Sequence, residues 1–148
     1  MAGNPLIDQG VLNRLIASVI VSENPSLNVT APYLGKEGLR LNLEGDSTIY
    51  LPTMTGAVRS QEPYLMVSLR MSLLKTQNLS DRYKRQMELN SFLGTVVVRP
   101  DSTALSPYTL INCSIANVGE LNLSGTEATY GPTIKGYYSI NTALYAQA

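Results

Sequence analysis

The segment Tyr64–Leu73 alternates between apolar and mostly polar positions, and this pattern constrains the fold more than any other feature of the sequence. Leucine, valine and methionine occupy its odd positions, whereas Ser68, Arg70 and Ser72 occupy even ones. A period of two predicts a half-buried β-strand. Ten residues at ~3.3 Å each span roughly 30 Å, which is long for a strand of a small domain.

Much of the remaining sequence also predicts strands. Apolar and polar residues alternate over 39–44, and Glu44-Gly45-Asp46-Ser47 then forms a turn signal before the β-branched and aromatic segment Thr48–Leu51. We therefore expect a long hairpin over about residues 38–60, in which Pro52 marks an edge or a bulge. The other expected strands are Leu15–Val21, Thr95–Arg99, Tyr108–Ile115, Leu121–Leu123 and Thr133–Leu144.

One segment predicts a helix. Leu79, Tyr83 and Met87 recur every four residues, and Gly94 is a natural stop, so we expect a helix over about residues 79–93. The predicted fold class is mainly β: a small β-sandwich or barrel of about seven or eight strands with one flanking α-helix. We expect a single domain over residues 1–148, with an extended N-terminal segment of about residues 1–14.

Charge is scarce in this chain. Charged residues make up 15% of the sequence, below the ~25% that is typical, and 11 basic residues balance 11 acidic ones. A surface largely covered by other chains explains this composition, and a low-charge monomer is the alternative. The neutral balance argues against broad nucleic-acid binding. No apolar run approaches the length of a membrane helix, and the N-terminus lacks the pattern of a secretory signal, so we expect folding in a cytoplasm.

The search for catalytic chemistry finds no candidate. The chain has no histidine and one cysteine, which excludes histidine-dependent triads and zinc fingers. Gly35-Lys36 lacks the remainder of a phosphate-binding loop, and Ser72-Leu73-Leu74-Lys75 lacks the companion motifs of serine acyltransferases. We expect Cys113 to be a buried structural thiol. No enzyme activity, metal or cofactor is predicted, which favours a structural or binding role.

Several segments of the sequence carry a family resemblance. They are Asn4–Leu15, Leu27–Gly35, Tyr64–Leu69, Leu73–Gln77 and Ile134–Asn141. Through them the chain resembles the tail tube proteins of contractile-tailed bacteriophages over nearly its whole length. The match is one of overall pattern, because none of these segments is a catalytic motif.

The resemblance implies a fold and an assembly. Tail tube subunits are small β-sandwiches or barrels with one flanking helix, and they form hexameric rings that stack into a hollow tube. Two hairpins per subunit join into an inner barrel of strands, through which DNA passes during ejection. The implied partners are further copies of the chain, the sheath around the tube, and the baseplate and tail terminator proteins. The implied location is the virion tail, assembled in the bacterial cytoplasm; the tube protein of type VI secretion has a similar fold.

The lumen of such a conduit must not hold DNA, which favours acidic or neutral side chains along its wall. We expect Asn42, Glu44 and Asp46 to face the lumen, and Arg40 to pair with an acidic neighbour. We expect Leu6 in the N-terminal segment, and Tyr33 beside the loop after Gly35, to mediate stacking between rings.

Other functions stay open at this point. One is a tail terminator or baseplate protein that forms a single ring. Another is the tube subunit of a phage-derived secretion or contractile particle. A third is a small β-barrel enzyme acting through carboxylates or hydroxyls, for which the sequence offers least.

Overall fold

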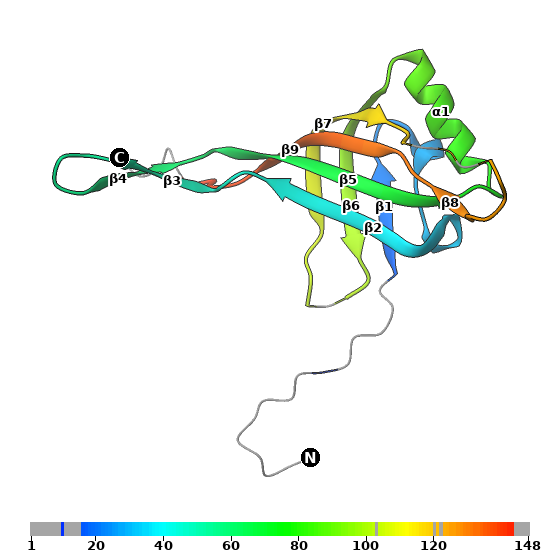
Figure 1. Ribbon diagram of the computed structural model, residues 1–148, viewed down its shortest axis with the longest axis horizontal. Helices are drawn as coiled ribbons and strands as arrows, with labels where there is room; N and C mark the ends of the chain where they lie inside the picture. The colour runs from blue at the N-terminus through cyan, green and yellow to red at the C-terminus, as the bar shows by residue number, and fades with distance from the viewer. Residues whose placement is uncertain (1–9, 11–15, 103, 120, 122, 144–148) are drawn as a thin grey trace, which may run out of the picture.

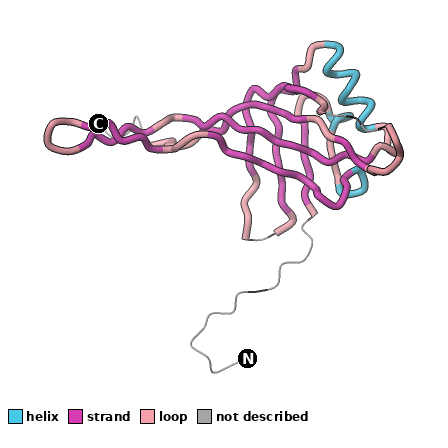
Figure 2. Tube along the Cα trace, viewed as in Figure 1, coloured by secondary structure: helices cyan, strands magenta, loops and turns pink. Residues whose placement is uncertain are grey.

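A curled antiparallel sheet dominates the computed structural model, which describes residues 10, 16–102, 104–119, 121 and 123–143 (Figures 1 and 2). Its seven strands are β1 (Ala17–Val21), β2 (Leu34–Glu44), β5 (Tyr64–Leu74), β6 (Phe92–Pro100), β7 (Tyr108–Asn117), β8 (Thr129–Tyr130) and β9 (Thr133–Ser139). Their spatial order is β1-β6-β7-β9-β5-β2, and β8 pairs with β5. Two further strands, β3 (Thr48–Pro52) and β4 (Ala57–Gln61), pair only with each other.

The hydrophobic core lies on the inner face of this curled sheet. In β5 the odd residues Val67, Leu69, Met71 and Leu73 are buried, as the sequence alternation predicts. The helix α1 (Leu79–Leu89) and the 3-10 helix η1 (Pro25–Leu27) contact each other, and α1 also contacts β5 and β7. A second 3-10 helix, η2 (Ala31–Tyr33), leads into β2.

Tyr83 joins α1 to η1 inside the core. Its side chain is fully buried, and its hydroxyl donates a hydrogen bond of 2.6 Å to the carbonyl oxygen of Leu27, which is also buried. Burial raises the pKa of the Tyr83 hydroxyl well above its usual value, so the group stays a neutral donor. The bond satisfies a phenol that would otherwise be costly to bury.

The mainly β fold class with one helix is confirmed, but the predicted helix was four residues too long. It ends at Leu89, and Ser91 adopts a left-handed backbone with a φ of 61°. Phe92 and Leu93 belong to β6, as does Gly94, which lies in an irregular stretch of the pairing between β6 and β7 instead of stopping the helix. On the helix surface, Arg85 and Asp81 form an ion pair at 2.9 Å.

The predicted hairpin over residues 38–60 was wrong in its pairing. The chain does not reverse at Glu44-Gly45-Asp46-Ser47: β2 pairs with β5 from Leu34 to Glu44, and β3 pairs with β4 beyond it. The reversal occurs between β3 and β4, where the Thr53 amide donates to the Gly56 carbonyl oxygen at 2.8 Å. Gly45, with a φ of +90°, bends the backbone without turning it.

The remaining strand predictions have mixed outcomes. Strands β1, β6, β7 and β9 occupy the predicted places, although β9 ends at Ser139. Leu121 and Leu123 lie outside any strand, and Asn122, Leu15 and Leu144 fall outside the described residues. Cys113 is buried as expected. Burial raises the pKa of its thiol and a backbone hydrogen bond with Val96 opposes the rise, so that the pKa is about 11. None of the described helices has the length and apolar character to span a bilayer.

We predict that Tyr83→Phe lowers the free energy of unfolding by about 1–2 kcal/mol, because the buried Leu27 carbonyl oxygen loses its donor. Urea denaturation followed by circular dichroism measures this. Tyr50→Phe is the matched control, since Tyr50 is mostly exposed and should leave stability unchanged. Equal stability of the Tyr83 variant and the wild type would contradict the role given to this bond.

Candidate self-association surfaces

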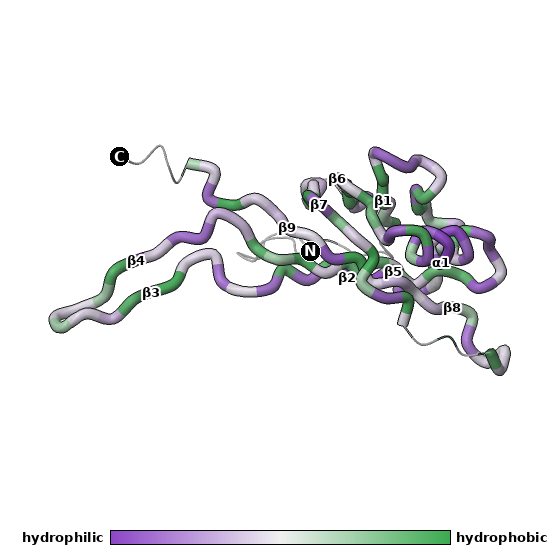
Figure 3. Tube along the Cα trace, turned by 90° about the horizontal axis from the view of Figure 1, so that it is seen from above, coloured by the Kyte–Doolittle hydropathy of each residue, from purple (hydrophilic) through white to green (hydrophobic). Residues whose placement is uncertain are grey.

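A two-stranded ribbon projects from one end of the sheet, and we call residues 48–61 the arm (Figures 1 and 3). Its pairing runs from Thr48 and Gln61 at the base to Pro52 and Ala57 beside the turn. Among the described residues, neither strand of the arm pairs with the main sheet. Two isolated strands are marginally stable in water, so this ribbon needs support from elsewhere.

One face of the arm is apolar. Leu51 and Val58 are directly opposite each other and therefore share a face, and Ile49 lies two residues from Leu51 on that face. These three residues, which we call the apolar arm face, are 42–55% exposed, and Met54 at the turn is 98% exposed. Figure 3 shows the corresponding hydrophobic stretches along β3 and β4. A ribbon this thin has no interior of its own in which to bury them.

Hydrogen bonds fix the arm root, by which we mean residues 45–47 and 62–63. The Glu62 amide donates to the Ser47 carbonyl oxygen at 3.0 Å. The side-chain amide of Asn141 donates to the carbonyl oxygens of Ser47 at 3.1 Å and Glu62 at 2.7 Å. Asn141 follows β9 and has a left-handed φ of 48°. Because its side chain bonds to both strands of the root, the end of β9 is tied to the root.

The two edges of the curled sheet differ. The chain itself covers part of the β1 edge: Val19 and Val29 exchange two backbone hydrogen bonds, and the Asn28 side chain accepts one from the Val21 amide. Strand β2 pairs with β5 on one side, and no described segment pairs with its other side. Both edges contribute residues to a cavity of about 270 Å³, which is lined by Ile16, Ala17, Ala31, Leu34, Gly35, Lys36, Gly38 and Leu39.

The outer face of the sheet carries polar residues from β2, β5 and β9. Arg40 of β2 is directly opposite Arg70 of β5, and Asn42 is opposite Ser68. Ser68 is in turn opposite Lys135 of β9. Like charges directly opposite each other in a sheet destabilise it unless an anion lies nearby.

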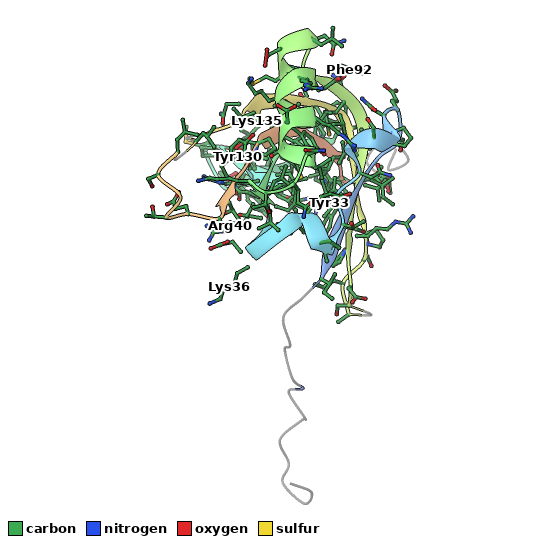
Figure 4. All side chains as sticks on the ribbon, turned by 90° about the vertical axis from the view of Figure 1, so that its right-hand side faces the viewer. Tyr33, Lys36, Arg40, Phe92, Tyr130 and Lys135 are labelled. Atoms are coloured by element: carbon green, nitrogen blue, oxygen red, sulfur yellow. The ribbon has the colours of Figure 1, made fainter. Side chains whose placement is uncertain are left out.

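A polar cleft of about 740 Å³ lies at the end of the sheet away from the arm, and Figure 4 shows Lys36 and Arg40 on the same side of the molecule. We call it the β8 cleft. It combines three cationic side chains, two carboxylates and several hydroxyls. Its lining residues are Gly35, Lys36, Glu37, Arg40, Arg70, Ser72, Leu74, Thr126, Glu127, Ala128, Thr129, Tyr130 and Gly131.

The structure brings the predicted lumen residues together, whereas the predicted stacking residues lie elsewhere or outside the described residues. Asn42 and Glu44 share the outer face of β2, and the exposed Asp46 follows in the arm root, so the three predicted lumen residues are neighbours. Tyr33 ends η2 and is half-buried, with part of its side chain packed against the core. Leu6 lies outside the described residues. The expected acidic partner of Arg40 is absent among the described side chains, because neither recorded ion pair includes this residue.

The sequence reasoning missed the arm. It assigned Thr48–Leu51 to a hairpin with the preceding strand and gave its exposed apolar residues no role. The segment Pro52-Thr53-Met54-Thr55-Gly56, rich in turn formers and followed by a second short apolar run, was the available signal for a separate ribbon.

No group of three or more Asp, Glu or Cys side chains within the described part of the chain could hold a metal ion. The chain was also compared with known proteins: no protein-family model matches it, and the search of curated proteins found no match. The features of the described residues that bear on function are the arm, the unpaired β2 edge and the β8 cleft.

We predict that Asn141→Gly loosens the arm root. The variant keeps the left-handed backbone but loses both side-chain donors, so amide hydrogen exchange over residues 45–47 and 62 should accelerate roughly tenfold. Asn112→Gly is the matched control, because Asn112 is an exposed asparagine with a φ of 53°. Identical exchange rates at the root in the two variants would contradict the proposed clamp.

Proposed function

We propose that this chain is a structural subunit of a hollow tail tube of the contractile-tailed phage type, built from hexameric rings that stack and conduct DNA. The proposal extends the family resemblance of the sequence. One observation carries it: the apolar arm face is exposed on a ribbon that cannot bury it. A second copy is the partner that such a ribbon requires.

The arm supports an open-ended stack. It projects along the long axis of the molecule, away from the β8 cleft (Figure 1). When the arm of one copy packs on a different surface of the next, each copy keeps a free arm at one end and a free receiving surface at the other. A contact of this head-to-tail kind generates filaments instead of closed pairs.

The free β2 edge supports closure of rings. An unpaired edge strand is a template for pairing with another chain, and closing strands from several copies into one barrel removes it. In such a barrel the outer face of β2 would form part of the lumen wall. Asn42, Glu44 and Asp46 are then the proposed lumen residues, and Leu6 and Tyr33 remain the proposed stacking residues.

The remaining features of the proposal follow from the tail tube class. The partners would be the sheath, the baseplate and the tail terminator, the location would be the virion tail, and the subunit would be non-enzymatic without a cofactor. Electron microscopy of the concentrated protein tests the proposal. Long hollow tubes would support it, single closed rings would favour a terminator or baseplate protein, and a monomer at all concentrations up to the millimolar range would contradict it.

We predict that Leu51→Ser/Val58→Ser raises the critical concentration for assembly roughly 100-fold. The two substitutions remove apolar area that the contact buries, at a combined loss of about 3 kcal/mol. Sedimentation of a concentration series measures it.

The control is Tyr50→Ser/Ala57→Ser, which places the same number of substitutions on the opposite face of the arm. Circular dichroism verifies that both variants keep the strand signal. If the two variants assemble as readily as each other, the apolar arm face has no special part in the contact.

A further inference from the structure

Two arginines are directly opposite each other in the β8 cleft, and neither forms an ion pair among the described residues. Arg40 and Arg70 are directly opposite across the β2–β5 pairing, and both line the cleft. Lys36 lines it as well. The described part of the chain has two ion pairs, both on the surface of α1, and neither includes these cations.

Three carboxylates lie at or beyond the other end of β2. Glu44 is its last residue, and Asp46 and Glu62 belong to the arm root. Glu44 and Asp46 are exposed, and none of the three forms an ion pair among the described residues. Arg40 and Glu44 share a face of β2 but are roughly 13 Å apart at ~3.3 Å per residue, which is too far for an ion pair within one copy.

We infer that the β8 cleft of one copy receives Glu44 and Asp46 of a second copy. The cleft and the arm root are at opposite ends of the sheet (Figure 1), so a shift along the long axis brings the root of one copy to the cleft of the next. The pairing gives Arg40 and Arg70 the anion that their juxtaposition requires. This inference rests on the proposed function and deepens it, because it names the residues that set the axial register.

The charge pattern of the cleft favours a protein segment over a nucleic acid. Glu37 and Glu127 line the same cleft as the three cations. A phosphate backbone is uniformly negative, so these carboxylates would repel it. A protein segment can carry charges of both signs: in the arm, Arg59 precedes Glu62 by three residues and is directly opposite Tyr50. The cleft, with charges of both signs, therefore matches the arm and its root taken together, which also carry charges of both signs.

The pairing also bears on the lumen wall. Arg40 shares the outer face of β2 with Asn42 and Glu44, where a free cation would attract passing DNA. Neutralisation of Arg40 by the next copy leaves the wall without free positive charge at this position. The same contact then sets the axial register between copies and removes a positive charge that would slow the passage of DNA.

Charge reversal with complementation tests the inference. The cleft variant is Arg40→Glu/Arg70→Glu, and the root variant is Glu44→Arg/Asp46→Arg. Either variant alone places like charges at every axial contact, so its critical concentration should rise at least tenfold above that of the wild type. An equal mixture should assemble again, because each cleft then meets a root of opposite charge.

Complementation also controls for folding, since an unfolded variant cannot be restored by mixing. The neutral variant Arg40→Gln/Arg70→Gln provides a second measurement. Wild-type assembly should weaken several-fold between 0.05 and 0.3 M salt, roughly the range over which surface charges become screened, whereas the neutral variant should lose this dependence. Arg99→Gln, on β6 away from the cleft, is the matched control.

The outcomes separate the two proposals. Reversed variants that assemble like the wild type, or a mixture that fails to assemble although each variant is folded, would overturn the inference and leave the tube proposal standing. Wild-type protein that never assembles would overturn both. A 20-base-pair DNA duplex at low salt is the remaining probe: if it binds the wild type but not the cleft variant, and that variant assembles normally, the cleft holds nucleic acid and the inference is wrong.

Discussion

A two-stranded ribbon has no interior, and this constraint governs most of what the structure implies. The main sheet buries its apolar face against α1 and η1, with Tyr83 hydrogen-bonded to Leu27 at their junction. The arm has no such cover, yet it presents Leu51 and Val58 on one face. The chain therefore contains a domain that is complete in itself and an extension that is not.

The fold shows where the few charged residues of the sequence lie and which of them are paired. The surface of α1 holds its charges in ordinary pairs between neighbouring turns, such as Asp81 with Arg85. The cations of the β8 cleft and the carboxylates near the arm root lack such partners within the described chain. A neutral total thus conceals an uneven distribution: cations outnumber carboxylates in the β8 cleft, whereas the arm root at the other end of the sheet is acidic.

Sequence reasoning recovered the elements whose side chains have a regular environment. The alternation over Tyr64–Leu73 located β5 almost to the residue, because every second side chain of that strand enters one core. The helix was extended too far because Phe92 and Leu93 continue its apolar pattern, although the backbone has already left the helix at Ser91. The spacing of apolar residues along the sequence does not reveal a change in backbone angle such as that at Ser91.

The pairing of strands and the geometry of the candidate site were harder to predict from the sequence. Glycine and aspartate at 45 and 46 are typical of a hairpin turn, but a turn and a bend that continues the ribbon use the same residue types. The opposition of Arg40 and Arg70 depends on the register between two strands that are not consecutive in sequence, which the pattern within either strand does not encode. Candidate residues could thus be named from sequence, while their partners could not.

The unequal edges of the sheet limit how copies can meet side by side. Val29 and Asn28 occupy part of the β1 edge, which leaves β2 as the freer one. Two copies joined through their β2 edges by a twofold axis would use up both of these edges and stop as a dimer. Any larger closed ring must join β2 to a different part of its neighbour. Such a ring has a rotational sense, because, seen from one end, every subunit contacts the next through β2 in the same direction.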